Sequence, residues 1–183
     1  MQSAAAYWHN LPMWNAELAK TFQWRRGSMR RSDREILDRD KMLAIAAECD
    51  CCRLGLSDKG RAYIVPMNFG FTDENGVLTL YFHCASEGRK LELIGGGAYA
   101  GFEMDCGHAL VEADSACAFS YSYKCVMGEG KIEQVTDVSE KLLALNLIMK
   151  HYSGRDSWSF EPRIVDKLTI LRLTVTAWSC KVR

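Results

Sequence analysis

One short stretch of the chain gathers residues that could bind or react with a ligand: His83, Ser86, Arg89 and Lys90. Residues 77–82 before it are rich in leucine, aromatic and β-branched side chains, which predicts a strand. Residues 86–94 predict a turn and then a helix, with Ser86 as the capping residue. A hydroxyl and two cations at a helix start suit a phosphate, because free backbone N–H groups and the positive end of the helix dipole lie there too. The pattern therefore indicates a site for a phosphorylated ligand.

The same residues also have an ordinary structural interpretation. Basic side chains in a first helical turn are often only solvated charges, and a histidine at a strand end is more often structural than catalytic. From this stretch alone, the structural interpretation is favoured.

The composition of the chain limits the classes of protein to which it can belong. The chain has 183 residues, of which 48% are hydrophobic and 25% charged, as expected for one globular domain. Its net charge of zero provides no global field to attract nucleic acid or an anionic membrane, and no apolar run has the length of a membrane span. We expect neither partner.

The chain has eight cysteines and no secretory signal pattern, which predicts a reduced, cytoplasmic protein. Cys49 and Cys52 have C-x-x-C spacing, but no second such pair exists, so we expect no metal site.

The first 28 residues are interpreted as an N-terminal extension. Leu11, Trp14, Leu18 and Phe22 recur at helical spacing, which favours an amphipathic arm. Met29 opens a sequence typical of a natural start, which favours a start-site artefact instead. The sequence leaves both interpretations open.

The remaining residues, 29–183, predict one mainly β domain. The turns at Asp58-Lys59-Gly60 and Asn75-Gly76 are hairpin signals, and Pro66 favours an edge strand, a bulge or a ligand-facing gap in the strand ladder. Strands are expected at residues 51–57, 62–71, 77–83, 98–105, 117–135 and 166–180; helices at residues 39–48, 86–94 and 139–152; and a loop at residues 106–115. Short turns imply antiparallel pairing. The predicted fold is an antiparallel split β-barrel of six to seven strands with peripheral helices.

From Met29 onward the chain resembles the FMN-binding split-barrel proteins of the pyridoxamine 5′-phosphate oxidase-like superfamily, and within it the 5-nitroimidazole resistance proteins. The likeness lies in the order of four pieces: Met29-Arg-Arg-Ser-Asp-Arg-Glu-Ile36, Cys52-Arg-Leu-Gly-Leu56, Tyr63-Ile-Val-Pro-Met-Asn-Phe-Gly70 and Tyr81-Phe-His-Cys-Ala-Ser-Glu-Gly-Arg-Lys90. The combination is specific, although no single piece is.

The resemblance implies FMN bound at the interface of a homodimer. Ser86, Arg89 and Lys90 would hold its phosphate, and His83 would lie near the flavin. Cys84 stands where the family usually has a serine, which puts one hydrogen bond to the cofactor in doubt. The strand beside the isoalloxazine ring would supply the remaining contacts of this protomer: Tyr63, Ile64, Val65, Pro66 and Asn68. Trp158 would reach the partner's site.

The resemblance further implies a flavoenzyme that passes electrons from an external donor to a small aromatic acceptor, as in nitroimidazole reduction. His83 would then be a proton donor or only a hydrogen-bond partner of the cofactor. Of the adjacent Tyr81 and Phe82, one would face the cofactor and the other the core. The alternative is a binding module, a split barrel that binds haem, a deazaflavin, or a flavin without turnover; the candidate axial ligands for haem are His9, His108 and His151.

Overall fold

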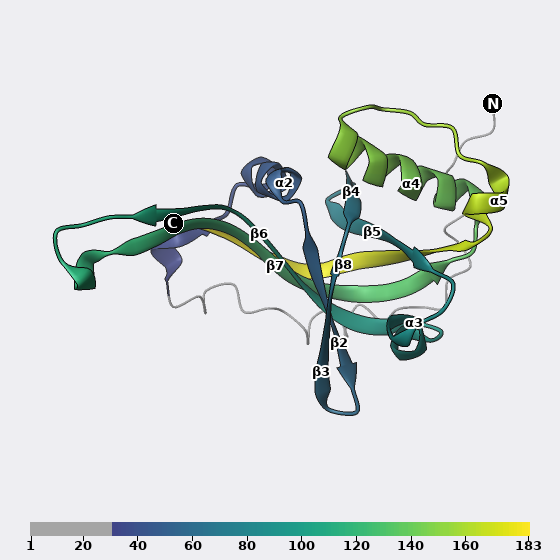
Figure 1. Ribbon diagram of the computed structural model, residues 1–183, viewed down its shortest axis with the longest axis horizontal. Coiled ribbons are helices and arrows are strands. Elements are labelled where there is room, and N and C mark those ends of the chain that lie inside the picture. Colours follow the sequence, from purple (N-terminus) through teal and green to yellow (C-terminus); the bar gives the residue numbers. More distant parts are fainter. Residues whose placement is uncertain (1–30) are drawn as a thin grey trace. The chain divides into compact units, whose positions relative to one another are not determined.

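A computed structural model describes residues 31–183, which form an antiparallel sheet with helices packed against it (Figure 1). The interpretation of residues 1–28 as an extension lies outside the described residues. No helix in the described range is long and apolar enough to cross a membrane.

The sheet contains eight strands among these residues, slightly more than the sequence predicts. They are β1 (Glu35–Ile36), β2 (Cys52–Asp58), β3 (Arg61–Met67), β4 (Phe69–Glu74), β5 (Val77–Ala85), β6 (Ala98–Val111), β7 (Ser120–Val135) and β8 (Leu168–Val182). Their order is β3-β2-β6-β7-β8-β5-β4, with the short β1 pairing with β8. The predicted split β-barrel class is confirmed.

Both predicted hairpin turns are confirmed. Lys59 and Gly60 have φ of 50° and 86°, and Asn75 and Gly76 have φ of 53° and 77°. Two successive positive φ values are typical of the type I′ turn, whose twist matches that of the flanking strands. These turns join β2 to β3 and β4 to β5.

The expectation of a single strand over residues 62–71 is wrong. The chain forms β3, which pairs with β2, and then β4, which pairs with β5. Asn68 alone separates these two strands, which are the outermost strands of the sheet order. The chain therefore crosses at Asn68 from one edge of the sheet to the other. Pro66 lies in an edge strand, which is one of the alternatives that the sequence left open, because proline cannot donate to a ladder on both sides.

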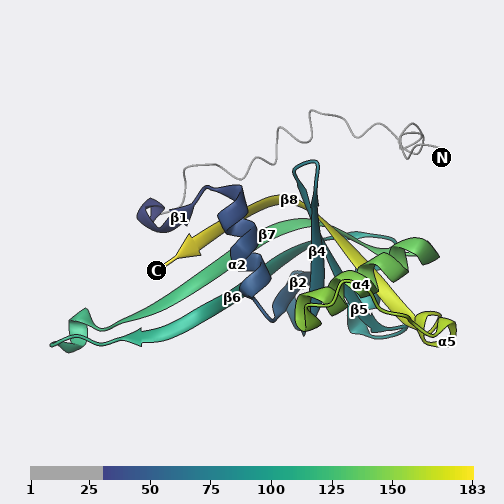
Figure 2. The ribbon, with the colours of Figure 1, turned by 90° about the horizontal axis from the view of Figure 1, so that it is seen from above.

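The expected loop at residues 106–115 is also partly wrong. Strand β6 continues to Val111 and pairs with β7, with a register shift between Cys106 and Ala109. The bulge lets the pairing continue where the alternation of the sequence is interrupted. The resulting β6–β7 hairpin extends well beyond the other strands (Figure 2).

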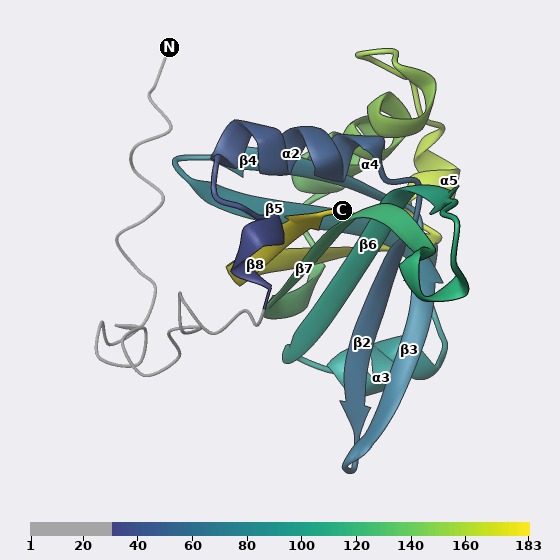
Figure 3. The ribbon, with the colours of Figure 1, turned by 90° about the vertical axis from the view of Figure 1, so that its left-hand side faces the viewer.

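The helices are α2 (Arg39–Glu48), α3 (Arg89–Ile94), α4 (Val138–Ser153) and α5 (Pro162–Val165), with single 3-10 turns at Ser32–Arg34 and Ala116–Ala118. Asp38 and Asp137 cap α2 and α4 by accepting from the backbone N–H groups of Lys41 and Glu140. The short α5 was not predicted. Figure 3 shows α3 beside the β2–β3 hairpin and α4 alongside β4 and β5.

Two cores hold these elements together. The larger lies between α2, α3 and one face of the strands, with Phe69, Phe82 and Leu171 completely buried. The smaller lies under α4 and includes Tyr81, Leu145 and Ile170. Phe82 is 0% exposed and Tyr81 only 6%, so the expectation that one of them faces a cofactor is wrong. Each lies in a core, one on either face of β5.

Candidate functional site

The end of β5 and the start of α3 bring the predicted ligand-binding residues together. His83, Ser86 and Arg89 are exposed, and Lys90 is half-buried. The helix begins at Arg89, after Gly88 with φ of 131°, and no side chain caps it. Ser86 is therefore not the cap, contrary to the sequence prediction. Since α3 has only six residues, the site depends on its side chains and not on a helix dipole.

Arg89 and Lys90 differ in their surroundings. Arg89 Nη2 lies 2.5 Å from Asp58 Oδ2, and its Nη1 lies 2.8 Å from Glu92 Oε2. The hydrogen bond to Asp58 is the largest of the effects that raise the pKa of Arg89. Lys90 has no acidic partner among residues 31–183. Arg89 thus joins α3 to the end of β2, and Lys90 is the cation available for an anionic ligand.

Cys84 points away from this exposed group. It is 9% exposed and belongs to the larger core. Burial raises the pKa of its thiol, and the neighbouring Lys90 charge opposes that rise. The thiol therefore fills space in the core, and the charge of Lys90 lies close enough to affect its pKa.

The five residues predicted on or after β3 divide between two environments. Tyr63 and Val65 pack against the larger core, whereas Ile64, Pro66 and Asn68 are exposed, with Ile64 at 66%. Among residues 31–183, β3 pairs only with β2, so within that range its other edge has backbone groups free for a ligand. Asp58 is the cross-strand partner of Arg61, so this free edge begins near the Asp58–Arg89 ion pair.

A network of polar and charged side chains, which includes the Tyr81 hydroxyl, holds β5 against β8 and α4. The Tyr81 hydroxyl donates to Glu140 Oε1 at 3.1 Å, and Arg172 Nη1 donates to the same oxygen at 2.8 Å. Arg172 also pairs with Glu133. Burial is the main cause that raises the pKa of Tyr81 to about 12, so its phenol stays protonated and can donate. His83 follows on the same face of β5, on a strand that these bonds immobilise.

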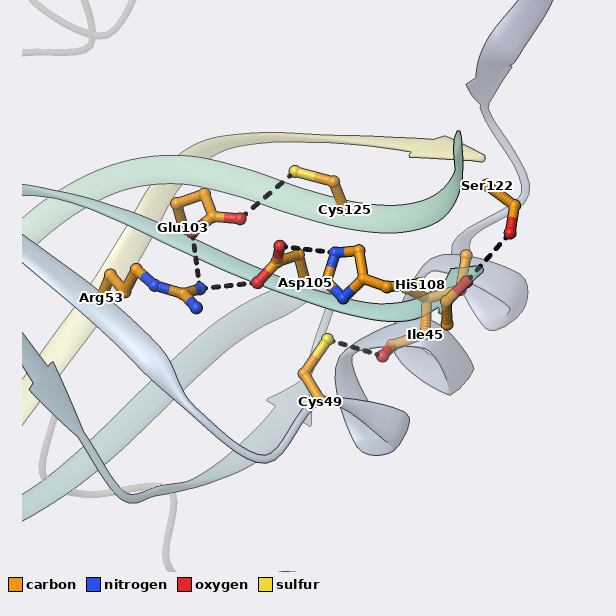
Figure 4. Close-up of polar contacts among 9 residues, drawn as sticks. Ile45, Cys49, Arg53, Glu103, Asp105, His108, Ser122 and Cys125 are labelled. Carbon is orange, nitrogen blue, oxygen red and sulfur yellow. Dashed lines mark hydrogen bonds and ion pairs between the residues drawn. The ribbon is translucent and has the colours of Figure 1, made fainter. Parts of the chain in front are cut away.

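A second polar cluster was not found by sequence reasoning (Figure 4). Arg53 Nη1 binds Glu103 Oε2 at 3.0 Å and Asp105 Oδ1 at 2.6 Å, and His108 Nε2 lies 2.8 Å from Asp105 Oδ2. Cys125 donates to Glu103. The cluster joins β2, β6 and β7. Its residues come together because the strand register places Arg53 opposite Glu103 and Asp105 opposite Cys125. Within residues 31–183 no group of three or more His, Cys, Asp or Glu side chains could hold a metal ion.

Trp158 lies against α4 of its own chain. Its backbone N–H donates to Asn146 Oδ1 at 2.8 Å, and the Arg155 guanidinium lies 5.1 Å from its ring centroid. Its indole Nε1 is buried and lacks a hydrogen-bond partner in the described part of the chain. The reach of Trp158 into a partner's site stays a prediction.

The two described histidines that were considered as haem ligands are already engaged. His151 Nε2 lies 2.7 Å from the carbonyl oxygen of Cys49, and its ring packs 4.4 Å from that of Phe69. His108 pairs with Asp105. His9 lies outside the described residues. Neither His108 nor His151 therefore favours haem over a phosphorylated cofactor.

Comparison with known proteins decides the family. Residues 38–182 match the family model described as pyridoxamine 5′-phosphate oxidase. The chain belongs to this family. The resemblance inferred from its motifs is confirmed. No curated protein matches the chain in sequence.

Solved structures of this pyridoxamine 5′-phosphate oxidase fold agree. A candidate 5-nitroimidazole antibiotic resistance protein from Bacteroides thetaiotaomicron is 32% identical, covers 81% of this chain and 86% of its own, and has a TM-score of 0.70. The flavocytochrome Anf3 from Azotobacter vinelandii is 21% identical, with coverage of 85% and 72% and a TM-score of 0.69. The FAD and haem binding protein from Mycobacterium smegmatis is 19% identical, with coverage of 81% and 73% and a TM-score of 0.69. The last two show a shared fold alone.

Proposed function

We propose that this member of the pyridoxamine 5′-phosphate oxidase family binds FMN and reduces a small aromatic acceptor, with nitroimidazoles as the model class. The observation that carries the proposal is Lys90, a half-buried cation without an acidic partner in residues 31–183, beside the exposed Ser86 hydroxyl. A phosphate satisfies both groups, because charge-assisted hydrogen bonds to its oxygens are strong. The likeness to the Bacteroides protein, named for nitroimidazole resistance, supports the acceptor class.

The surrounding residues fit FMN. Lys90 and Ser86 would hold the phosphate, with Arg89 contributing the part of its guanidinium that Asp58 and Glu92 leave free. The free edge of β3 offers carbonyl and N–H groups of the kind that the polar edge of a flavin ring requires. Pro66 on that strand has no N–H to leave unpaired.

FMN, when bound, supplies the redox chemistry, taking electrons from a donor and passing them to the acceptor. The chain supplies position and protons. His83 is exposed on the immobilised β5, three residues before Ser86 of the proposed phosphate site, so we assign it to the proton that the reduced acceptor needs. We also propose a homodimer with the cofactor at its interface. Light scattering tests it, because a monomer with full flavin content would contradict a shared site.

The first experiment is the visible spectrum of the purified protein, with the released cofactor identified by its mass. A flavin spectrum and the mass of FMN are expected. A Soret band would replace the proposal with the haem-binding alternative. A colourless protein that stays colourless when FMN is added would contradict the proposed binding of FMN.

Replacing Lys90 by alanine should weaken FMN binding about 30-fold, since a charge-assisted hydrogen bond contributes roughly 2 kcal/mol. Riboflavin, which lacks the phosphate, should bind the variant as well as it binds the wild type. Fluorescence titration of both ligands measures the two affinities. The matched control is Lys41→Ala, which removes an exposed lysine from α2. Equal losses for FMN and riboflavin would show that Lys90 does not hold the phosphate.

Replacing Asp58 by asparagine tests the role of Arg89. The change removes the negative charge that binds the guanidinium at 2.5 Å, so Arg89 becomes free to bind phosphate. We expect FMN affinity to rise about threefold, a modest gain because the pair is partly exposed and screened by solvent. If Arg89 only joins α3 to β2, the affinity will fall or stay the same.

A further inference from the structure

The last turn of α4 forms hydrogen bonds with two segments that connect secondary-structure elements. The Tyr152 hydroxyl accepts a hydrogen bond from the Phe69 N–H at 3.2 Å and donates one to the Asp50 carbonyl at 2.8 Å. These partners are 83 and 102 residues away along the chain. One phenol therefore connects the start of β4 with the segment that leads into β2.

The first of these places is the crossing between the two edges of the sheet. Phe69 is the first residue of β4 and is completely buried, whereas Asn68 before it is exposed. Asn68 belongs to neither strand, so no ladder hydrogen bond of β3 or β4 fixes it. The position of Asn68 therefore depends on the hydrogen bond of the Phe69 N–H, which donates to the Tyr152 hydroxyl.

The close packing of α4 on β4 makes this contact possible. A Cβ on Gly70 would lie 2.5 Å from Ile148 N, so only glycine lets the helix backbone approach so closely. The neighbouring His151 ring packs on Phe69 and forms an edge contact with the Tyr152 ring, whose centroid lies 4.8 Å away. The Tyr152 ring is thus fixed on its inner side, although 42% of the residue remains exposed.

The peptide group between Asn68 and Phe69 takes part in this contact, because its N–H donates to the Tyr152 hydroxyl. Burial raises the pKa of Tyr152, while hydrogen bonding with the Asn68 side chain and with the Phe69 backbone lowers it. The phenol is therefore bound to the peptide group that directly follows the Asn68 Cα.

We propose that Tyr152 is a positioning residue of the cofactor site, which holds the Asn68 amide in the orientation that binds the polar edge of the flavin ring. This inference rests on the proposed function, because Asn68 directly follows β3 and is among the residues that the family resemblance implies beside the flavin ring. Tyr152 acts through Asn68 and need not touch the cofactor. A hydrogen bond weakens steeply as its angle departs from linearity, so a small displacement of the amide is enough to lose the contact.

The test is Tyr152→Phe, which keeps the ring and removes both hydrogen bonds of the hydroxyl. We expect FMN and riboflavin to bind about tenfold more weakly, with a shift of the long-wavelength flavin band, because the ring contact is lost and the phosphate contact is not. This pattern differs from that of Lys90→Ala, which should affect FMN alone. Tyr121→Phe is the control, since the Tyr121 ring lies on the β6–β7 hairpin and stacks on His108. Unchanged affinity and spectrum in Tyr152→Phe would overturn the inference.

A double-mutant cycle separates positioning from general support of the fold. Asn68→Ala leaves the bonds of Tyr152 to the backbone intact and should reproduce the same loss and spectral shift. The double variant should bind no more weakly than Asn68→Ala, because Tyr152 acts through the amide. Additive losses, or normal binding by Asn68→Ala, would overturn the inference even if Tyr152→Phe folds poorly. A wild type that binds no flavin would instead refute the proposed function, and the inference with it.

Discussion

Replacing His83 by alanine should leave FMN bound and slow the reduction of a nitroaromatic acceptor about 100-fold, the lower end of what a general acid contributes. His83 is exposed on β5, between the buried Phe82 and Cys84. Its loss therefore removes a proton donor without opening a cavity. The flavin content should be unchanged, because the phosphate and the ring edge are assigned to other residues.

Stopped-flow absorbance separates the two halves of this reaction. Reduction of the flavin by the donor should be unaffected, and its reoxidation by the nitro compound should be slow. His108→Ala is the matched control, because His108 pairs with Asp105 and lies in the bulge of β6, on another strand than His83. Flavin lost on purification would mark His83 as a binding residue. Normal reoxidation with normal flavin content would remove it from the reaction altogether.

Replacing Gly70 by alanine should destabilise the fold by about 3 kcal/mol, at the upper end of the usual cost of overpacking. The new methyl group would lie 2.5 Å from both Ile148 N and Leu147 C, which are backbone atoms of α4. A helix backbone cannot move aside as a flexible side chain can. Helix α4 must therefore shift from β4, and the smaller core beneath it opens.

Urea unfolding followed by tryptophan fluorescence measures this change. Gly96→Ala is the matched control, because a Cβ there meets no atom within 4 Å and the residue does not have a positive φ. Its free energy of unfolding should change by less than about 0.5 kcal/mol. Equal stability of the two variants would show that α4 does not pack on β4 at this distance. If α4 shifts, Gly70→Ala should also weaken flavin binding through Tyr152.

Local sequence patterns were sufficient wherever a few neighbouring residues decide the conformation. Asn75-Gly76 and Lys59-Gly60 identified their turns, because few residues tolerate two successive positive φ values. Pro66 identified an edge strand because proline lacks the N–H that an inner strand must donate. The order of short motifs then identified the family, which the match over residues 38–182 confirms.

Local patterns failed where an element distant in sequence decides the strand pairing or the burial of a residue. The chain around Asn68 reads as one continuous strand, and only the opposite pairing partners of β3 and β4 divide it. Tyr81 and Phe82 were expected to face different environments by alternation. The two faces of β5 are both covered, one by the larger core and the other by α4, so both rings are buried.

The sequence by itself determined the split-barrel class, the hairpins, the edge strand and the stretch that carries His83, Ser86 and Lys90, because all of these depend on residue type and short spacing. The tertiary structure alone decided that Arg89 is paired with Asp58 while Lys90 is not, and that Tyr152 reaches Phe69. Such contacts join residues 31 and 83 positions apart, and no local pattern encodes them. They form only when the sheet and α4 bring those segments together.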